Sequence, residues 1–560
     1  MGSSNSTLKM PLCQGVNIEE LSIAQLKTHL SKGSFTSTEL AQCYLKRIQL
    51  LNPRVRAVIE TNPDALALAA AMDSERATGK LRSAIHGIPF IVKDNIATSD
   101  KMQTTAGSAA LVGTTVPADA AVVAALRAAG GILLAKANLS EWASMRASWY
   151  AEAYSSRGGQ NRNPYNLAEH PGGSSSGSAS ALATNMCAFS IGTETDGSVM
   201  FPADRNAVVG IKPSVGFASC VGVIPEAPSF DTVGPFGRSV EDATVVLDIM
   251  ANRGENGGKF AKDYVSFLAK QDVLKGAKFG LPWKRTWEMA NRSERYKSEY
   301  NTLMGLTTKL ERAGAKVVRV DFPSAEEIIS PHGWDWSYAE GEPGSKLSEL
   351  EVANVEFYRS LREYLSKLGN NTKKILSLED VIAYNIKHTD TEGGVPGTHD
   401  AWPTGQDGLD AAVEAKDEDE SVYREALEYI QRQSRERGID AALRYEDDKL
   451  DGLLVPLQAE GGVACSVAAK AGYPMISIPV SVAENGVPFG IGIIQTAWRE
   501  DLLIRYGSAI EDLLLSGGHA RHKPTFRNLD ATNYTYVGGP PRTPSRKFTS
   551  TIFDLALGKT

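Results

Sequence analysis

Residues 118–137 read ADAAVVAALRAAGGILLAKA, an apolar stretch that changes character at a pair of glycines. Its first part has the spacing of a helix that Gly130 closes, and ILLAKA at 132–137 has the short apolar run of a buried strand. A helix followed at once by such a strand is the repeating unit of α/β proteins. The stretch therefore predicts an α/β fold.

The same alternation extends in both directions from this stretch. GIPFIVKD at 87–94 precedes it as a strand, and LDGLLVP (450–456), GYPMISIPV (472–480) and FGIGIIQ (489–495) follow near the other end. A helical pattern, DLLIRYGSAIEDLL at 501–514, comes after them. We expect these strands to form one largely parallel or mixed sheet that the last three close.

Two helices are predicted near the N-terminus. SIAQLKTHL begins with a Ser22/Gln25 capping box and the next helix with a Thr36/Glu39 box, and Pro53 is expected to follow the end of the second helix. We therefore divide the chain into a disordered leader (1–16), a single domain (17–516) and a poorly ordered tail (517–560). Within the domain we expect N-terminal helices (17–53), a core (80–250), a variable insert (about 255–450) and closing strands with a helix (451–516). A length of 560 residues also allows several domains.

Composition limits the classes of function. The chain is 42% hydrophobic and 22% charged with a net charge of −7, values that fit a soluble enzyme and argue against a nucleic-acid partner. No apolar run reaches the roughly 18 residues of a transmembrane segment. The five cysteines are scattered, so we expect a cytoplasmic protein with no disulfide framework, no metal and no cofactor. The MGSSNS start fits an acylation pattern at Gly2, and we favour a plain leader.

The chemistry is expected between residues 170 and 214, HPGGSSSGSASALATNMCAFSIGTETDGSVMFPADRNAVVGIKPS. Residues Gly172 to Ser180 are all Gly, Ser or Ala, which let the backbone approach a ligand closely. A phosphate-binding loop is excluded because neither G-x-x-x-x-G-K-[ST] nor G-x-G-x-x-G occurs in the right context. The run leads directly into an apolar segment, so it belongs to the core.

A reactive serine in this region needs a base. No G-x-S-x-G elbow surrounds Ser198, and His170 is one alternative base because it lies close in sequence. A lysine held neutral by burial is the other, and Lys93 ends the apolar GIPFIVKD run. The competing interpretation is a salt bridge between Lys93 and the adjacent Asp94, which would hold the lysine charged.

Three motifs together resemble the amidase signature family: GIPFIVKDN with Lys93, GGSSSGSAS with Ser174, and GTETDGS with Ser198, 24 residues after Ser174. The resemblance extends from TSTELAQCYLKRI through TTAGSAAL and AKANLSEWA to AGYPMISIPV and weakens in the insert and the tail. It implies α/β/α layers around a large mixed β-sheet. It also implies hydrolysis of carboxamide C–N bonds through an acyl-serine, which releases ammonia or an amine.

The resemblance assigns roles to individual residues. Ser198 would be the nucleophile, Lys93 the final base and Ser174 the relay between them, with a cis peptide bond at Gly173–Ser174. The backbone N–H groups of four consecutive residues would form the oxyanion hole: Thr195, Asp196, Gly197 and Ser198. The carboxylates of Glu194 and Asp196 would orient the loop, because a negative charge aimed at an oxyanion would oppose it.

The segments GTETDGSV, NLSEWA and SSRGGQNRNPY are most similar in sequence to the peptide-amidase branch of the family, so we expect a small-molecule or peptide amide as substrate. The chain departs from many members at Val199-Met200, where they carry Ile-Arg. The alternatives are a transamidase subunit that acts with partners, and an amide-forming or scaffold protein without independent hydrolysis.

Overall fold

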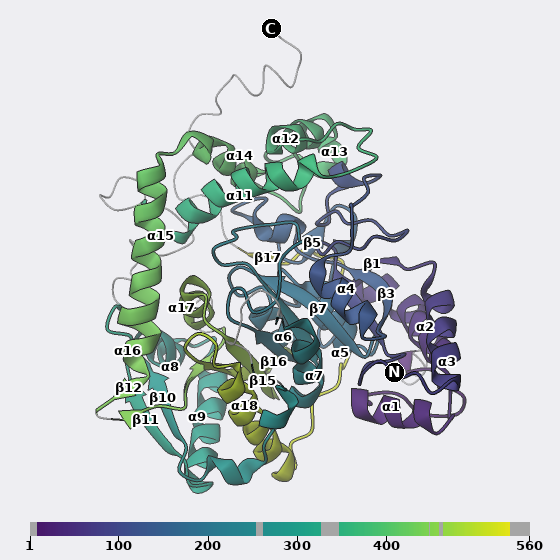
Figure 1. The fold of residues 1–560 in the computed structure, drawn as a ribbon. Helices are drawn as coiled ribbons and strands as arrows, with labels where there is room; N and C mark the ends of the chain where they lie inside the picture. Colours follow the sequence, from purple (N-terminus) through teal and green to yellow (C-terminus); the bar gives the residue numbers. More distant parts are fainter. Residues whose placement is uncertain are drawn as a thin grey trace.

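A mixed β-sheet of 11 strands runs through the molecule, and helices pack on it (Figure 1). The computed structural model describes residues 8–537 except 252, 254–260, 262, 326–345, 447 and 459–462. The α/β fold class predicted from the sequence is confirmed, and the sheet is mixed, as expected. Among the described residues, no helix is both long and apolar enough to cross a membrane.

The strand order across the sheet is β1-β3-β2-β7-β9-β8-β15-β16-β14-β10-β11. Strands β3, β2 and β7 are parallel to one another, as are β14, β10 and β11, and the other neighbouring pairs are antiparallel. The strands are β1 (Val58–Thr61), β2 (Pro89–Lys93), β3 (Ile132–Ala137), β7 (Phe189–Glu194), β8 (Val209–Lys212), β9 (Thr232–Gly237), β10 (Lys278–Pro282), β11 (Lys316–Val320), β14 (Gly452–Pro456), β15 (Met475–Val482) and β16 (Pro488–Ile494).

The described residues also form three two-stranded sheets: β4 (Tyr150–Ala151) with β17 (Tyr536–Val537), β5 (Tyr154–Ser155) with β6 (Gly159–Gln160), and β12 (Arg444–Tyr445) with β13 (Asp448–Lys449). The α-helices are α1 (Ile23–Ser31), α2 (Ser37–Val55), α3 (Ala65–Ala77), α4 (Ala121–Ala128), α5 (Ser176–Ala183), α6 (Met200–Arg205), α7 (Val240–Met250), α8 (Glu288–Arg292), α9 (Lys297–Arg312), α11 (Glu349–Ser366), α12 (Leu378–Lys387), α13 (Thr389–Glu392), α14 (Asp407–Glu414), α15 (Glu420–Ser434), α16 (Asp440–Ala442), α17 (Val463–Ala471) and α18 (Glu500–Ser516).

The two N-terminal helices start where the sequence predicts. Both capping boxes form, at Ser22 for α1 and at Thr36 for α2. Helix α2 nevertheless includes Pro53 and ends at Val55, beyond the predicted end. The proline lies in the last turn, where its missing N–H costs one hydrogen bond, and the Asn52 side chain fixes the helix end through two 2.8 Å bonds to the Val58 backbone.

The predicted leader and tail are both too long. Leu8, Met10 and Cys13 are buried, so residues 8–16 pack against the core instead of forming part of a disordered leader. At the other end, Thr525 donates to the Tyr165 carbonyl at 2.7 Å, and β17 pairs with β4. Residues 517–537 are therefore ordered on the domain, because they supply backbone pairing that composition does not reveal. The rest of the leader, with Gly2, and of the tail lies outside the described residues.

The predicted insert at 255–450 also contributes to the sheet. Strands β10 and β11 form one edge of it, and β10 pairs with β14 in parallel register. Helices α11 to α14 of the same region gather at one end of the molecule, at the top of Figure 1. The first half of this region is therefore part of the α/β core. Strand β11 was not predicted because, as an edge strand with exposed and half-buried residues, it lacks the continuous apolar run of a buried strand.

The stacked rings of Phe90 and Phe189 contribute to the core at the centre of the sheet, and a variant of Phe189 can measure this contribution. The two rings stack with centroids 5.1 Å apart between β2 and β7, and both side chains are fully buried. We expect Phe189→Ala to lower the free energy of unfolding by about 3–5 kcal/mol through the lost contacts and the cavity. Thermal melts should show a clearly lower Tm than for the wild type.

Leu81→Ala is the matched control, because Leu81 is 52% exposed. We expect its effect to stay within about 0.5 kcal/mol. Equal changes in Tm for the two variants would contradict this account of the core.

Candidate active site

Lys93 is the last residue of β2, and every residue of that strand is buried. Its Nζ lies 2.8 Å from Ser174 Oγ, 2.8 Å from Thr193 Oγ1 and 3.2 Å from the Thr193 carbonyl oxygen. Thr193 reaches it because β7 runs parallel to β2 at hydrogen-bonding distance. The amine is thus held entirely by neutral partners.

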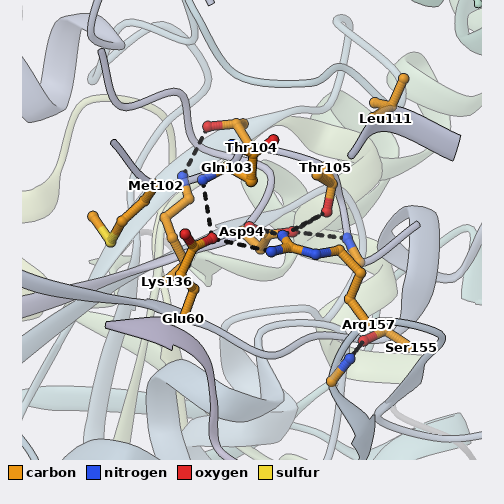
Figure 2. Close-up of polar contacts among 12 residues, drawn as sticks. Glu60, Asp94, Met102, Gln103, Thr104, Thr105, Leu111, Lys136, Ser155 and Arg157 are labelled. Carbon is orange, nitrogen blue, oxygen red and sulfur yellow. Dashed lines mark hydrogen bonds and ion pairs between the residues drawn. The ribbon is translucent and has the colours of Figure 1, made fainter. Parts of the chain in front are cut away.

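Asp94, the competing partner in the sequence, is held elsewhere. Its carboxylate accepts hydrogen bonds from the Thr105 hydroxyl at 2.6 Å and the Gly107 N–H at 2.9 Å. It also lies 3.5 Å from the Arg157 guanidinium, which pairs with Glu60 as well (Figure 2). Successive side chains at a strand end point to opposite sides, so Asp94 faces away from the Lys93 amine. The predicted alternative of a Lys93–Asp94 salt bridge is not what the structure shows.

A second buried lysine lies on the neighbouring strand. Lys136 of β3 donates to Thr104 Oγ1 at 3.0 Å, as Figure 2 shows, and it also donates to the Ile96 carbonyl. Burial lowers its pKa to about 8. Unlike Lys93, Lys136 has no hydrogen bond to a serine among the described residues, so we assign it to the support of the segment 96–104.

Ser174 lies between Lys93 and Ser198. Its Oγ is 2.9 Å from Ser198 Oγ, so an unbroken chain of three polar side chains links the amine to Ser198. Ser174 precedes α5, and the Gly173–Ser174 peptide bond is cis, as the resemblance implied. Ser198 follows β7 in a tight loop. The structure therefore brings together three residues that are up to 105 positions apart in the chain.

The environment of Lys93 favours its neutral form. Complete burial removes water from the ammonium and lowers the pKa of Lys93 to about 7. Four carboxyl groups oppose this shift: Glu226, Asp231, Glu194 and Glu152. Burial has the larger effect, so a substantial fraction of the amine is neutral near pH 7.

The loop from Thr195 to Ser198 is held at both ends. Glu194 accepts the Val199 N–H at 2.6 Å and the Met200 N–H at 2.9 Å, and the Ser198 carbonyl accepts the Ser175 N–H at 3.1 Å. Within the described part of the chain, the N–H groups of Asp196, Gly197 and Ser198 have no hydrogen-bond partner. They are therefore available to a bound ligand.

Gly197 shows why this loop needs a glycine. Its φ is +74°, and a Cβ at this position would lie 2.4 Å from the Phe201 ring. Val199 and Met200, where many family members have Ile-Arg, are fully buried. Their side chains pack in the core, and their N–H groups hold the loop through Glu194.

Acidic groups that the sequence did not indicate surround the loop. The Thr195 hydroxyl lies 2.8 Å from Glu226 Oε2 and 2.5 Å from Asp231 Oδ1. Burial raises the pKa of both carboxyl groups. Glu152 packs against Gly173, where a Cβ would lie 1.9 Å from its Oε1. No local pattern could have found them, because only the tertiary fold places these acids beside the loop.

Asp196 does not point its carboxylate at the serines. Ser466 donates to Asp196 Oδ2 at 2.7 Å, and Lys470 Nζ lies 3.3 Å from the same oxygen. Both partners belong to α17, on the far side of the loop. The expectation that Glu194 and Asp196 orient the loop is consistent with both sets of contacts.

His170, the alternative base, supports the glycine-rich loop. Its Nδ1 accepts the Gly172 N–H at 3.2 Å, and burial lowers its pKa well below the ordinary value. In the regions that the structure describes, no hydrogen bond joins its ring to Ser174 or Ser198. No group of three or more His, Cys, Asp or Glu residues among the described residues could hold a metal ion.

Comparisons with known proteins agree on one family. The family model named Amidase matches residues 39–394. A Schizosaccharomyces pombe protein named as an amidase is 47% identical over 95% of this chain and 91% of its own length. The crystal structure of peptide amidase from Stenotrophomonas maltophilia matches with a TM-score of 0.78 and 37% identity, over 91% of this chain and 99% of that one. A glutamyl-tRNA(Gln) amidotransferase subunit from Acinetobacter baumannii is 30% identical over 87% of this chain and 95% of its own length.

The lowered pKa of Lys93 predicts a pH-dependent stability. Between pH 7 and the ordinary pKa of 10.5, the unfolded chain binds more protons at Lys93 than the folded chain does, so the free energy of unfolding rises with pH in this range. The destabilisation by the buried ammonium is therefore complete below pH 7 and absent above pH 10.5. Lys93→Met lacks this group. We expect the Tm of the variant minus that of the wild type to decrease as pH rises from about 7 to about 10.

Thermal melts of both proteins at several pH values test this expectation. Lys27→Met, at an exposed position of α1, reports the effect of removing a surface ammonium over the same range. A Tm difference for Lys93→Met that stays constant with pH would contradict a lysine with a lowered pKa.

Proposed function

The chain belongs to the amidase family and is a hydrolase of carboxamide C–N bonds, and from this membership we propose that Ser198 is its nucleophile. Ser174 and Lys93 would carry the proton that Ser198 loses. One observation supports this assignment above all others: the unbroken contact from the buried Lys93 amine through Ser174 Oγ to Ser198 Oγ, at 2.8 and 2.9 Å.

The first step forms the bond between Ser198 Oγ and the carbonyl carbon of the amide. As this bond forms, the Ser198 proton moves to Ser174 Oγ, and the Ser174 proton moves to the neutral Lys93 amine. Ser174 therefore ends the step as a neutral hydroxyl. Lys93 becomes an ammonium, which can donate hydrogen bonds to the Thr193 hydroxyl and carbonyl at 2.8 and 3.2 Å.

The carbonyl oxygen becomes an oxyanion in this step. We assign its stabilisation to the N–H groups of Thr195, Asp196, Gly197 and Ser198, the last three of which have no other partner among the described residues. One such donor is typically worth about 2.7–4 kcal/mol in the transition state. The loop is fixed by Glu194 before substrate binds, so the donors need no reorganisation.

The tetrahedral intermediate then breaks its C–N bond. The proton held by Lys93 returns through Ser174 to the leaving nitrogen, which departs as ammonia or an amine. Water attacks the resulting acyl-serine by the same relay, releases the carboxylic acid and restores neutral Lys93.

We assign the substrate to the peptide amides. The neighbour with 37% identity and a TM-score of 0.78 is named peptide amidase. The amidotransferase subunit is more distant, with 30% sequence identity, so we favour hydrolysis over a partner-dependent transamidase. Ammonia release from C-terminal peptide amides, compared with small aliphatic amides at equal concentration, tests this assignment.

We also propose that the protein works in a reducing compartment such as the cytoplasm. All five cysteines are free thiols, and four of them are buried. Their number and burial fit a protein that does not depend on disulfide bonds.

Labelling with a fluorophosphonate tests the nucleophile without a known substrate. We expect one adduct, mapped to Ser198 by peptide mass spectrometry, and no adduct in Ser198→Ala. Lys93→Ala should lose nearly all labelling and lower kcat/KM at least about 1,000-fold, because the serine then lacks its base, and Ser174→Ala should retain only a small residual activity. Labelling at another residue, or full activity in any of the three variants, would refute the relay.

The pH dependence of kcat/KM tests the base. Below the lowered pKa of Lys93, about 7, the amine is protonated and cannot accept the proton. We expect kcat/KM to fall about tenfold per pH unit below this value and to level off above it. A flat profile between pH 5 and 9 would exclude Lys93 as the base.

A further inference from the structure

The carboxylate of Asp196 poses an electrostatic problem for the proposed oxyanion hole. Its own N–H is one of the donors assigned to the oxyanion, so the same residue carries a donor to the oxyanion and a negative charge. In a site with little water, such a charge would oppose the transition state strongly. The contacts of Asp196 show how the protein neutralises it.

Lys470 of α17 supplies the compensating charge. Its Nζ lies 3.3 Å from Asp196 Oδ2 and 2.7 Å from Glu349 Oε2, and it donates to Ser466, which in turn donates to Asp196 at 2.7 Å. Lys470 is 1% exposed. Although burial acts against the ammonium, Glu349 and Asp196 raise the pKa of Lys470 above its ordinary value. Burial thus favours neutral Lys93, whereas the two carboxylates favour the ammonium form of Lys470.

Helix α11 holds Lys470 in this position. Glu349 is the first residue of α11, and Glu356 lies two turns later on the same face. Glu356 accepts the Ser229 N–H at 2.8 Å and the Ser229 hydroxyl at 2.5 Å, within the loop that carries Glu226 and Asp231. Helix α11 thus contacts two groups that hold the loop at residues 195–198. Glu349 contacts the lysine that pairs with Asp196, and Glu356 contacts the segment that carries the acids beside Thr195.

We propose that Lys470 is a positioning residue of the reaction, which neutralises Asp196 and fixes the direction of the oxyanion-hole N–H groups. Glu349 of α11 holds Lys470 in turn. This inference rests on the proposed function, because it requires Ser198 as nucleophile and residues 195–198 as the oxyanion hole. Lys470 acts through Asp196 and touches no reacting atom.

The experiment compares two variants that differ only at residue 196. Glu349→Gln with Lys470→Met leaves Asp196 uncompensated, and adding Asp196→Asn to this pair removes the negative charge. We expect the double variant to lower kcat for a peptide amide at least tenfold while KM changes less than about threefold, because the oxyanion exists only in the transition state. Adding Asp196→Asn should raise kcat at least fivefold over the double variant.

Thermal melts of both variants separate this role from a purely structural salt bridge. If both fold and Asp196→Asn restores no activity, or if the double variant keeps the wild-type kcat, the inference is wrong. If the double variant does not fold, Lys470→Arg and Lys470→Gln provide the comparison, because both can bond Ser466 and only the first is charged. A kcat at least tenfold higher for Lys470→Arg supports the inference, and equal values overturn it.

Fluorophosphonate labelling of the wild type keeps this test distinct from that of the proposed function. Absence of an adduct on Ser198 refutes the proposed nucleophile. An adduct on Ser198 together with wild-type kcat in the Glu349→Gln/Lys470→Met variant, or in Lys470→Gln, refutes only the role of Lys470.

Discussion

Complete burial of the Lys93 side chain is the constraint that sets the chemistry of the site. A lysine in water is charged at neutral pH and is no base, and only loss of hydration brings its pKa to about 7. The strand that ends at Lys93 is buried along its whole length between β3 and β7. The centre of the sheet therefore supplies the dry environment, and the parallel β7 supplies Thr193 as a neutral partner.

Burial alone would not keep the amine neutral if a carboxylate were paired with it. The nearest acid in sequence, Asp94, is held by Thr105 and Arg157 on the other side of the strand end. Two further acids, Glu226 and Asp231, share the Thr195 hydroxyl, and burial raises the pKa of both. Asp231 also accepts the Glu226 and Ala227 N–H groups at 2.9 and 3.0 Å. Because burial favours the neutral form of both acids, loss of hydration decides the charge of the lysine.

Helix α11, within the predicted insert at 255–450, supports the loop at residues 195–198. Helix α11 lies outside the sheet, yet its acids at Glu349 and Glu356 reach Lys470 and Ser229, on two sides of the nucleophile loop. In Figure 1, α11 lies higher in the view than α6 and α17. We therefore expect changes in this helix to alter the electrostatics of the loop.

Local sequence patterns were enough to locate the starts of the N-terminal helices and the strands β2, β3, β14, β15 and β16, because capping boxes and apolar runs depend on neighbours within about ten residues. The set Lys93, Ser174 and Ser198 came from the resemblance of three motifs to a known family, since the residues alone left the choice of base open. Tertiary packing, in contrast, determined which charged side chains form ion pairs. The pairing of Asp94 with Arg157 and of Asp196 with Lys470 joins residues 63 and 274 positions apart. Such contacts, like the edge strands β10 and β11, depend on long-range packing, and no local pattern encodes them.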